Sequence, residues 1–289
     1  MKRIWIFIFL LYFNPAFSQR VSRKILDIQT KSPASYATVK ILHTPKGVIA
    51  SNKGEFELSI DAADSVLFSC VGYQQKILIG KEIGTEVYLE PKIKTIETVT
   101  VKGKKTIRTI VLGNTDKNIK GDQNWRLTEY GKDEFAQKIE LPDSSLFYKI
   151  NKIYIPIKKS KRWGWGPLLL HIYSTDTVSE YPGEELLIKP LHFSNKDVRQ
   201  NRAIIDISSE NLYLYHSKSF FVGISSLQDT VTENGLTMLL LSKSSDARTY
   251  SRTLHSTSFA WIPFGLLMDW SINPNSARTY YSVEVEEMK

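Results

Sequence analysis

Residue types that can do chemistry are present in this sequence, but they are not spaced as in known catalytic or metal-binding motifs. The five histidines are His43, His171, His192, His216 and His255, and no two stand two or four residues apart, as metal-binding pairs usually do. Most of them fall in segments with strand patterns, which favours structural, hydrogen-bonded histidines. We therefore predict no metal site and no cofactor.

Acidic and nucleophilic residues point the same way. The acids of residues 133–134 and 184–185 are sequence neighbours, and neighbours on a strand point to opposite faces of a sheet. Neither pair therefore predicts two carboxylates acting on one substrate. Gly223-Ile224-Ser225-Ser226 shares only its beginning with the Gly-x-Ser-x-Gly nucleophile motif. We predict no catalytic residues, and we note that calcium held by backbone carbonyls would leave no motif.

A segment rich in tryptophan and basic residues is the candidate binding site. Lys161, Arg162, Trp163 and Trp165 lie in a segment expected to form a loop before a strand. Flat indole rings stack on the apolar face of a sugar, while lysine and arginine bind hydroxyl or acidic groups. Two interpretations stay open: a carbohydrate-binding loop, or two tryptophans that fold back as a lid on the edge of a β-sandwich.

The N-terminus has the pattern of a secretory signal. Lys2 and Arg3 precede an apolar run at residues 4–13, which is too short to span a bilayer. Ala16 and Ser18 place small residues where a signal peptidase reads, so we predict cleavage between Ser18 and Gln19. We expect an exported protein of the periplasm, the outer membrane or the cell surface, with no transmembrane anchor after cleavage.

Composition and charge agree with an exported globular protein. The chain has 289 residues, of which 42% are hydrophobic and 24% charged, so it is not disordered, collagen-like or a coiled coil as a whole. The net charge of +8 would suggest nucleic acid for a cytoplasmic protein. Because export is predicted, we expect no nucleic-acid partner.

Alternation with period two runs through most of the remaining sequence and predicts an all-β protein. Short strands separated by turns predict a small β-sandwich over residues 19–103, in which Gly54 suits a turn that needs positive φ. Residues 104–134 are polar and are expected to form a linker or long loop. Eight or nine further strands over residues 135–289 fit a larger, jelly-roll-like sandwich. The single cysteine, Cys70, lies in an apolar run, which predicts a buried and unreactive thiol.

Five segments of the first predicted domain occur in the order of a known family. They are residues 21–27, 35–40 (SYATVK), 51–58 (SNKGEFEL), 66–73 (VLFSCVGY) and 96–101 (IETVTV). Over residues 20–103 the chain resembles the carboxypeptidase-like regulatory domain, a transthyretin-like, Ig-like β-sandwich common in envelope proteins of Bacteroidetes-type bacteria. Asn52 stands where the family usually has Asp.

The resemblance implies an accessory module without catalytic residues of its own, found beside outer-membrane receptors, peptidases and adhesins. The C-terminal half resembles only uncharacterised β-domains that follow such modules, and it implies no function. We expect an exported, non-catalytic binding or interaction module of the cell envelope, whose partner is an envelope protein or a glycan. Two alternatives remain: a carbohydrate-binding protein that uses the Trp163/Trp165 loop, and a hydrolase with a motif-free site in the C-terminal domain. The hydrolase would need a deep pocket lined by convergent acids or histidines.

Overall fold

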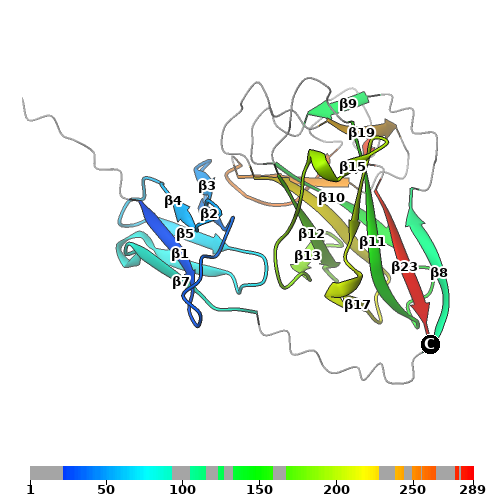
Figure 1. Ribbon diagram of the computed structural model, residues 1–289. Coiled ribbons are helices and arrows are strands. Elements are labelled where there is room, and N and C mark those ends of the chain that lie inside the picture. Colours follow the sequence, from blue (N-terminus) through cyan, green and yellow to red (C-terminus); the bar gives the residue numbers. More distant parts are fainter. Residues whose placement is uncertain are drawn as a thin grey trace, which may run out of the picture.

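The computed structural model describes residues 22–92, 105–114, 123–126, 133–158, 167–227, 238–243, 249–254, 256–264, 277–279 and 281–289. In this part of the chain the regular elements are strands, joined by short 3-10 turns such as Gly80–Glu82, Asn195–Asp197 and Ser208–Glu210. The all-β prediction is therefore confirmed. Figure 1 shows strands β1 to β7 in a small unit beside a larger unit that contains β8 to β23.

The small unit packs a three-stranded sheet against a four-stranded one. The first sheet has the order β4 (Glu55–Phe56), β1 (Arg23–Asp27), β7 (Glu86–Leu89). The second has the order β3 (Gly47–Ile49), β2 (Thr38–Ile41), β5 (Ser65–Ser69), β6 (Lys76–Ile79). Inward-facing residues of both sheets, among them Ile25, Val39, Phe56, Phe68 and Leu89, form one buried cluster. Burial of such side chains is the main driving force for this sandwich.

Two sequence predictions about the small unit can be compared with its geometry. Gly54 has a φ of +72°, and a Cβ at this position would lie 2.4 Å from the carbonyl oxygen of Ile25, so the turn does require glycine. Cys70 is half-buried rather than fully buried. Burial nevertheless raises the pKa of its thiol to about 12, which keeps it protonated and unreactive at neutral pH.

The larger unit is a second sandwich. Its seven-stranded sheet has the order β13 (Pro182–Glu185), β12 (Leu168–Thr175), β18 (Ser219–Ser226), β10 (Asp133–Glu140), β20 (Thr249–Thr253), β21 (Ile262–Pro263), and β14 (Leu191–Phe193) also pairs with β12. Its nine-stranded sheet contains β15 (Val198–Arg199), β16 (Arg202–Asp206), β11 (Phe147–Lys158), β19 (Met238–Lys243) and β22 (Ala277–Thr279), joined by β17 (Tyr213–Leu214), β23 (Ser282–Met288), β8 (Thr106–Gly113) and β9 (Gln123–Arg126).

The expected linker or long loop at residues 104–134 contains strands, so that expectation was wrong for residues 106–113, 123–126 and 133–134. Strand β8 pairs with β23 along its whole length, and β9 pairs with β19. Most side chains of β8 are exposed, which hides the alternation that marks a half-buried strand. Its partner β23 also lies at the other end of the sequence, and no local pattern reveals such a pairing.

The inner faces of the two large sheets enclose the main core. Every second residue of β12 and β18 points into it, and these are Leu168, Leu170, Ile172, Phe220, Val222 and Ile224. The residues between them belong to the outer face of the seven-stranded sheet. That face looks toward the small sandwich (Figure 1), and its side chains form the site described below. In the described residues, the structure contains no helix that is long and apolar enough to cross a membrane.

Candidate functional site

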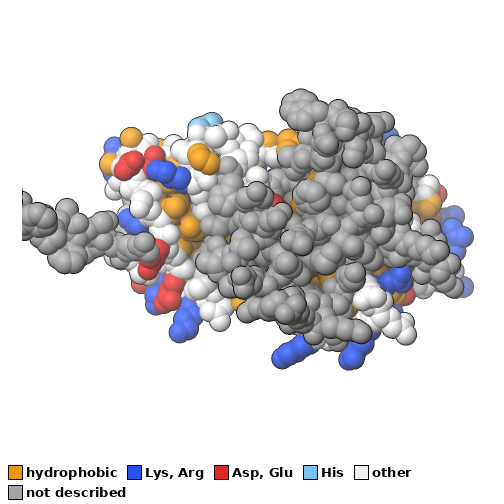
Figure 2. All heavy atoms as spheres, turned by 90° about the horizontal axis from the view of Figure 1, so that it is seen from above, with side chains coloured by type: hydrophobic (Ala, Val, Ile, Leu, Met, Phe, Trp, Pro, Cys, Tyr) orange, Lys and Arg blue, Asp and Glu red, His pale blue; other side chains and the backbone are white. Residues whose placement is uncertain are grey.

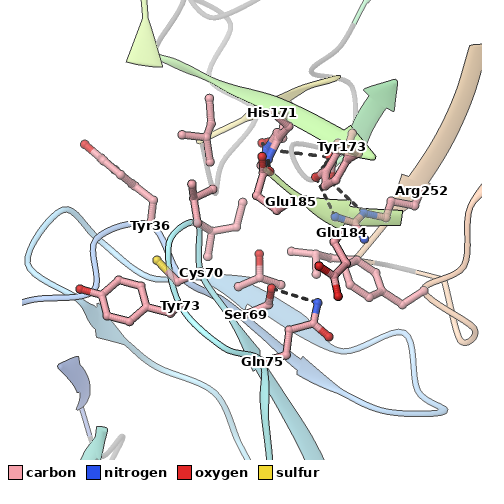
Figure 3. A pocket seen from close by; sticks show the side chains of 18 of the residues that line it. Tyr36, Ser69, Cys70, Tyr73, Gln75, His171, Tyr173, Glu184, Glu185 and Arg252 are labelled. Carbon is pink, nitrogen blue, oxygen red and sulfur yellow. Dashed lines mark hydrogen bonds and ion pairs between the residues drawn. The ribbon is translucent and has the colours of Figure 1, made fainter. Parts of the chain in front are cut away.

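A cavity of about 490 Å³ lies between the two sandwiches, lined by both. The first sandwich contributes Tyr36, Ser69 and Gln75 among others. The second contributes polar residues of the outer sheet face, including His171 and Arg252. Figure 3 shows Ser69 and Gln75 on one wall and Glu185, His171 and Arg252 on the other, whereas the ring of Tyr36 points away from them. The volume lies in the range of small-molecule sites.

Close contacts hold the two walls together. The ammonium group of Lys40, on β2, donates a hydrogen bond of 2.7 Å to the carbonyl oxygen of Leu254 in the second sandwich. Lys40 is completely buried, and desolvation lowers its pKa. At Gly72, which has a φ of +84°, a Cβ would lie 2.1 Å from the carbonyl oxygen of Ile188. The backbones of the two units therefore approach each other at a position where only glycine fits.

One ion pair forms the floor of the cavity on the second sandwich. Nε of Arg252 lies 2.8 Å from Oε2 of Glu134, and the hydroxyl of Tyr173 donates a hydrogen bond to the other carboxylate oxygen. Nη2 of Arg252 donates to that hydroxyl at 3.1 Å. Burial opposes ionisation of Glu134, but the charges of Arg252 and His171 outweigh it and hold the pKa of this carboxyl below its usual value.

His171 connects this ion pair to a second carboxylate. Its Nδ1 lies 2.7 Å from Oε2 of Glu185 and its Nε2 lies 2.9 Å from the hydroxyl of Ser225. The imidazole is buried, with Oε1 of Glu134 3.9 Å from Nε2. Burial alone would lower the pKa of His171, but the charge of Glu134 and the hydrogen bond to Glu185 outweigh it and raise that pKa.

Strand register explains why these residues meet. Ser225 on β18 lies opposite Glu134 on β10, which in turn lies opposite Arg252 on β20. Two residues along β18, Gly223 lies opposite His171 on β12. Directly opposed residues of neighbouring strands point to the same face of a sheet. The register thus gathers residues that are far apart in the sequence on one outer face.

Gly223 provides the space that the network needs. A Cβ on Gly223 would lie 3.2 Å from Cβ of His171 and 3.2 Å from Cε2 of Tyr173. Without that carbon, the Tyr173 ring stacks on the His171 imidazole, with ring centres 5.5 Å apart and planes 8° from parallel. The stacked pair then reaches across β18 to Glu134.

The site residues that were predicted from the sequence all lie outside the described part of the chain. Lys161, Arg162, Trp163 and Trp165 lie outside the described residues, as do Ser18 and Gln19 at the expected cleavage point. On the face of the first sandwich seen in Figure 2, basic and acidic side chains are interspersed, which is typical of a solvated surface.

The residues of the cavity are those from which the sequence predicted no site. Of the four described histidines, His43, His192 and His216 are exposed, and His171 alone is buried. The acids beside it come from two different acidic pairs, Glu134 from one and Glu185 from the other. Both members of the 184–185 pair line the cavity, so the expectation that sequence neighbours are kept apart was wrong for this pair. A usable signal was the apolar run within residues 219–226, SFFVGISS, because a strand without alternation is typical of burial on both faces, and β18 is indeed almost continuously buried.

Among the described residues, no group of three or more histidine, cysteine, aspartate or glutamate side chains could hold a metal ion. The chain matches no protein-family model, and comparisons with curated proteins and with solved structures found no match either. What can be said of function therefore depends on the cavity and its chemistry.

Proposed function

We propose that this chain is an exported binding protein of the cell envelope that holds a glycan in the cavity between its two sandwiches. The observation that carries the proposal is the cavity itself, which draws polar side chains from both units. A concave space of about 490 Å³ suits one or a few sugar units, whereas a protein partner would need a surface of roughly 800 Å² on each side.

The lining has the chemistry that sugars require. Thr38, Ser69 and Gln75 present hydroxyl and amide groups on the wall of the first sandwich, and Glu184 adds an exposed carboxylate on the opposite rim. The hydroxyl and amide groups both donate and accept hydrogen bonds, as hydroxyl-rich ligands do, and the carboxylate accepts them. Tyr36 belongs to the same lining, and its ring packs edge-to-face with His192 at the junction of the two units, with ring centres 5.4 Å apart.

Two features of the sequence support an envelope location. The signal-like segment at residues 1–18 predicts export, and the first sandwich resembles the carboxypeptidase-like regulatory domain, which is an accessory module of envelope proteins. A glycan is also an abundant ligand outside the inner membrane. In this proposal the first sandwich is one wall of the binding site rather than a separate accessory unit.

A glycan-array screen of the mature protein tests the ligand class. We expect binding that is lost in the double variant Gln75→Ala/Glu184→Ala, which removes one polar side chain from each wall. Gln29→Ala, an exposed residue of the first sandwich that does not line the cavity, is the matched control and should bind normally. Loss only in Trp163→Ala/Trp165→Ala would move the site to that loop, and silence from the wild type would overturn the glycan proposal.

The envelope location has its own test. Protein purified from expressing cells should begin at Gln19 when its intact mass is measured. A chain that retains Met1 would contradict export.

A further inference from the structure

Three groups in the cavity wall stand in the order of a catalytic relay. The hydroxyl of Ser225 lies 2.9 Å from Nε2 of His171, and Nδ1 of the same ring lies 2.7 Å from Oε2 of Glu185. A serine hydroxyl, an imidazole and a carboxylate joined in this way make up the arrangement that activates serine for acyl transfer, on folds that are otherwise unrelated.

The relay is held in place from behind. Oε1 of Glu185 accepts hydrogen bonds from the backbone N–H groups of Ile172, at 3.0 Å, and Leu187, at 3.2 Å. That leaves the other oxygen of Glu185 directed at His171. The ring of Tyr173 covers one face of the imidazole. Rigid support of this kind is what a catalytic base needs to keep one orientation.

Accessibility distinguishes this relay from a structural hydrogen-bond network. A histidine that only stabilises the fold needs no open side. Here Ser225 is incompletely buried and lines the cavity, as do His171 and Glu185. The hydroxyl therefore stands at the boundary between the network and the space in which a ligand would lie.

We propose that Ser225, His171 and Glu185 act as nucleophile, general base and orienting acid, and that the cavity hydrolyses an ester, an O-acyl group carried by a sugar hydroxyl. The choice of an O-acylated sugar as substrate rests on the proposed function, because the cavity is taken to bind a glycan. The hydrolytic activity itself depends only on the relay. It departs from the sequence-based expectation that the chain has no catalytic residues.

The reaction balances as an ester hydrolysis. The Ser225 oxygen bonds to the carbonyl carbon while Nε2 of His171 takes the hydroxyl proton. The tetrahedral oxyanion then collapses, the bond from that carbon to the sugar oxygen breaks, and His171 returns the proton to the sugar. A water molecule attacks the acyl-serine in the same way, which releases a carboxylic acid and restores Ser225. The net change is ester plus water to alcohol plus acid.

Arg252 is the positive charge placed to stabilise the oxyanion. It lies in the same cross-strand row as Ser225, with Glu134 between them. Two strand spacings put its backbone about 10 Å away, within reach of an extended arginine side chain. Arg252 also lines the cavity, and its guanidinium is held by the ion pair with Glu134 and lies over the ring of Trp261.

The charges around His171 predict the pH dependence of the activity. The groups that face the ring are Glu185 from β13, Glu134 from β10, Arg252 from β20 and Tyr173 from its own strand. Together they raise the pKa of His171, and only neutral imidazole can accept the serine proton. Activity should therefore increase with pH through a value above the ordinary histidine pKa of about 6.5. Glu134→Gln removes one raising charge and should move this limb to lower pH.

The decisive experiment is labelling of the full mature chain with a fluorophosphonate, which forms a covalent bond with activated serines. We expect one adduct per chain, located on Ser225 by peptide mass spectrometry and absent from Ser225→Ala and His171→Asn. Ser145→Ala removes an exposed hydroxyl of the second sandwich that does not line the cavity, and it is the matched control, which should label normally. Turnover of p-nitrophenyl acetate should decrease by about 100-fold or more in both relay variants.

A folded wild-type chain that gives no adduct overturns the proposal, as does labelling that persists in Ser225→Ala. Circular dichroism of each variant separates lost activation from lost structure, and Ser225→Ala, the smaller change, carries the test if His171→Asn does not fold. Ser225→Ala is also applied to the glycan array. If the wild type binds glycans but is not labelled, the proposed function is supported and the catalytic role of Ser225 is contradicted. If it is labelled but binds no glycan, the catalytic role is supported and the sugar substrate is contradicted.

Discussion

The two faces of the seven-stranded sheet are both buried, but they are buried by different means. The inner face carries aliphatic and aromatic residues such as Phe220, Val222 and Ile224, which pack against the partner sheet. The outer face carries Glu134, which is buried as well although it is charged. Burial of a charge costs several kcal/mol unless the charge is paired and hydrogen-bonded.

The difference shows what the first sandwich does for the second. Where β20 and β21 extend the sheet, the outer face is covered by Tyr250 and Trp261, which pack against the cluster of Ala136, Tyr173 and Phe221. Near β12 and β13 it is covered by the first sandwich, and there the covering leaves a cavity lined by charged and hydroxyl groups. An apolar face specifies the fold, whereas a buried polar face beside an open space is the usual composition of a binding or catalytic site.

The largest effect is expected from truncating the core on each face in turn. Phe220 and Phe221 are adjacent and both completely buried, but they point to opposite faces of the sheet. Phe220→Ala should lower the free energy of unfolding by about 4 kcal/mol and Phe221→Ala by about 3 kcal/mol, because the small outer cluster can collapse more easily. Urea unfolding measures both. A cost below about 1 kcal/mol for Phe221→Ala would mean that the outer face is open to water.

The second effect concerns the buried ion pair of the outer face. Arg252→Met leaves the carboxylate of Glu134 buried without its cation, so the free energy of unfolding should decrease by about 3 kcal/mol. The double variant Glu134→Leu/Arg252→Met removes both charges and should recover most of this loss.

A surface pair provides the control for that measurement. Lys24 and Glu55 lie 3.2 Å apart, with side chains 50% and 40% exposed. Lys24→Met should cost less than about 1 kcal/mol. An Arg252→Met variant as stable as Lys24→Met would show that Glu134 is solvated and that the outer face is not a buried site.

Sequence reasoning reached one face of this sheet and missed the other, for a physical reason. Alternation reports which residues of a strand face a core, and it predicted the all-β fold. It does not report what covers the remaining positions. Whether a second sandwich covers them depends on how the two units dock, which leaves no periodic signal.

The site could not be predicted from the sequence for a related reason. Glu134 and Arg252 are separated by 118 residues, and only the register of β10 with β20 brings them together. Motif searches detect groups that are close in sequence, so they cannot detect a relay assembled from three strands. Gly72 is part of a segment that carries the resemblance to the regulatory domain. Its role at the junction of the two units could not be predicted, because Ile188 belongs to the other sandwich.

A third, smaller effect tests the docking that covers the outer face. Gly72→Ala places a Cβ against the carbonyl oxygen of Ile188 in a left-handed backbone, and should cost about 2 kcal/mol. We expect the sandwiches to separate, so that small-angle scattering gives a larger radius of gyration and Cys70 in the cavity lining reacts faster with a thiol reagent. Gly84, with no close neighbour and no positive φ, is the control: Gly84→Ala should change neither measurement. Unchanged scattering and thiol reactivity in Gly72→Ala would contradict this contact.

The smallest effect is the pH dependence of stability that comes from His171. Its pKa is raised in the folded protein by Glu134 and Glu185, against the effect of burial. The folded state therefore binds the proton more tightly than the unfolded state. The resulting stabilisation is complete below the unfolded pKa of about 6.5 and is lost as the pH rises through the folded pKa. The pKa shift of Glu134 has the opposite sign. Its lowered pKa stabilises the fold above about pH 4.5, and this contribution is lost as the pH falls.

Urea unfolding between pH 5 and 9, a range set by the ordinary histidine pKa of about 6.5, should thus show a decrease in stability on the alkaline side. The decrease should be absent in His171→Asn. His43 is exposed and has a φ of 59°, a conformation that asparagine also tolerates, so His43→Asn is a matched control that should keep the decrease. Equal slopes in the wild type and His171→Asn would show that the imidazole is not coupled to the two carboxylates. The outer face would then be a solvated surface like that of any half-buried sheet, and the contrast between the two faces would disappear.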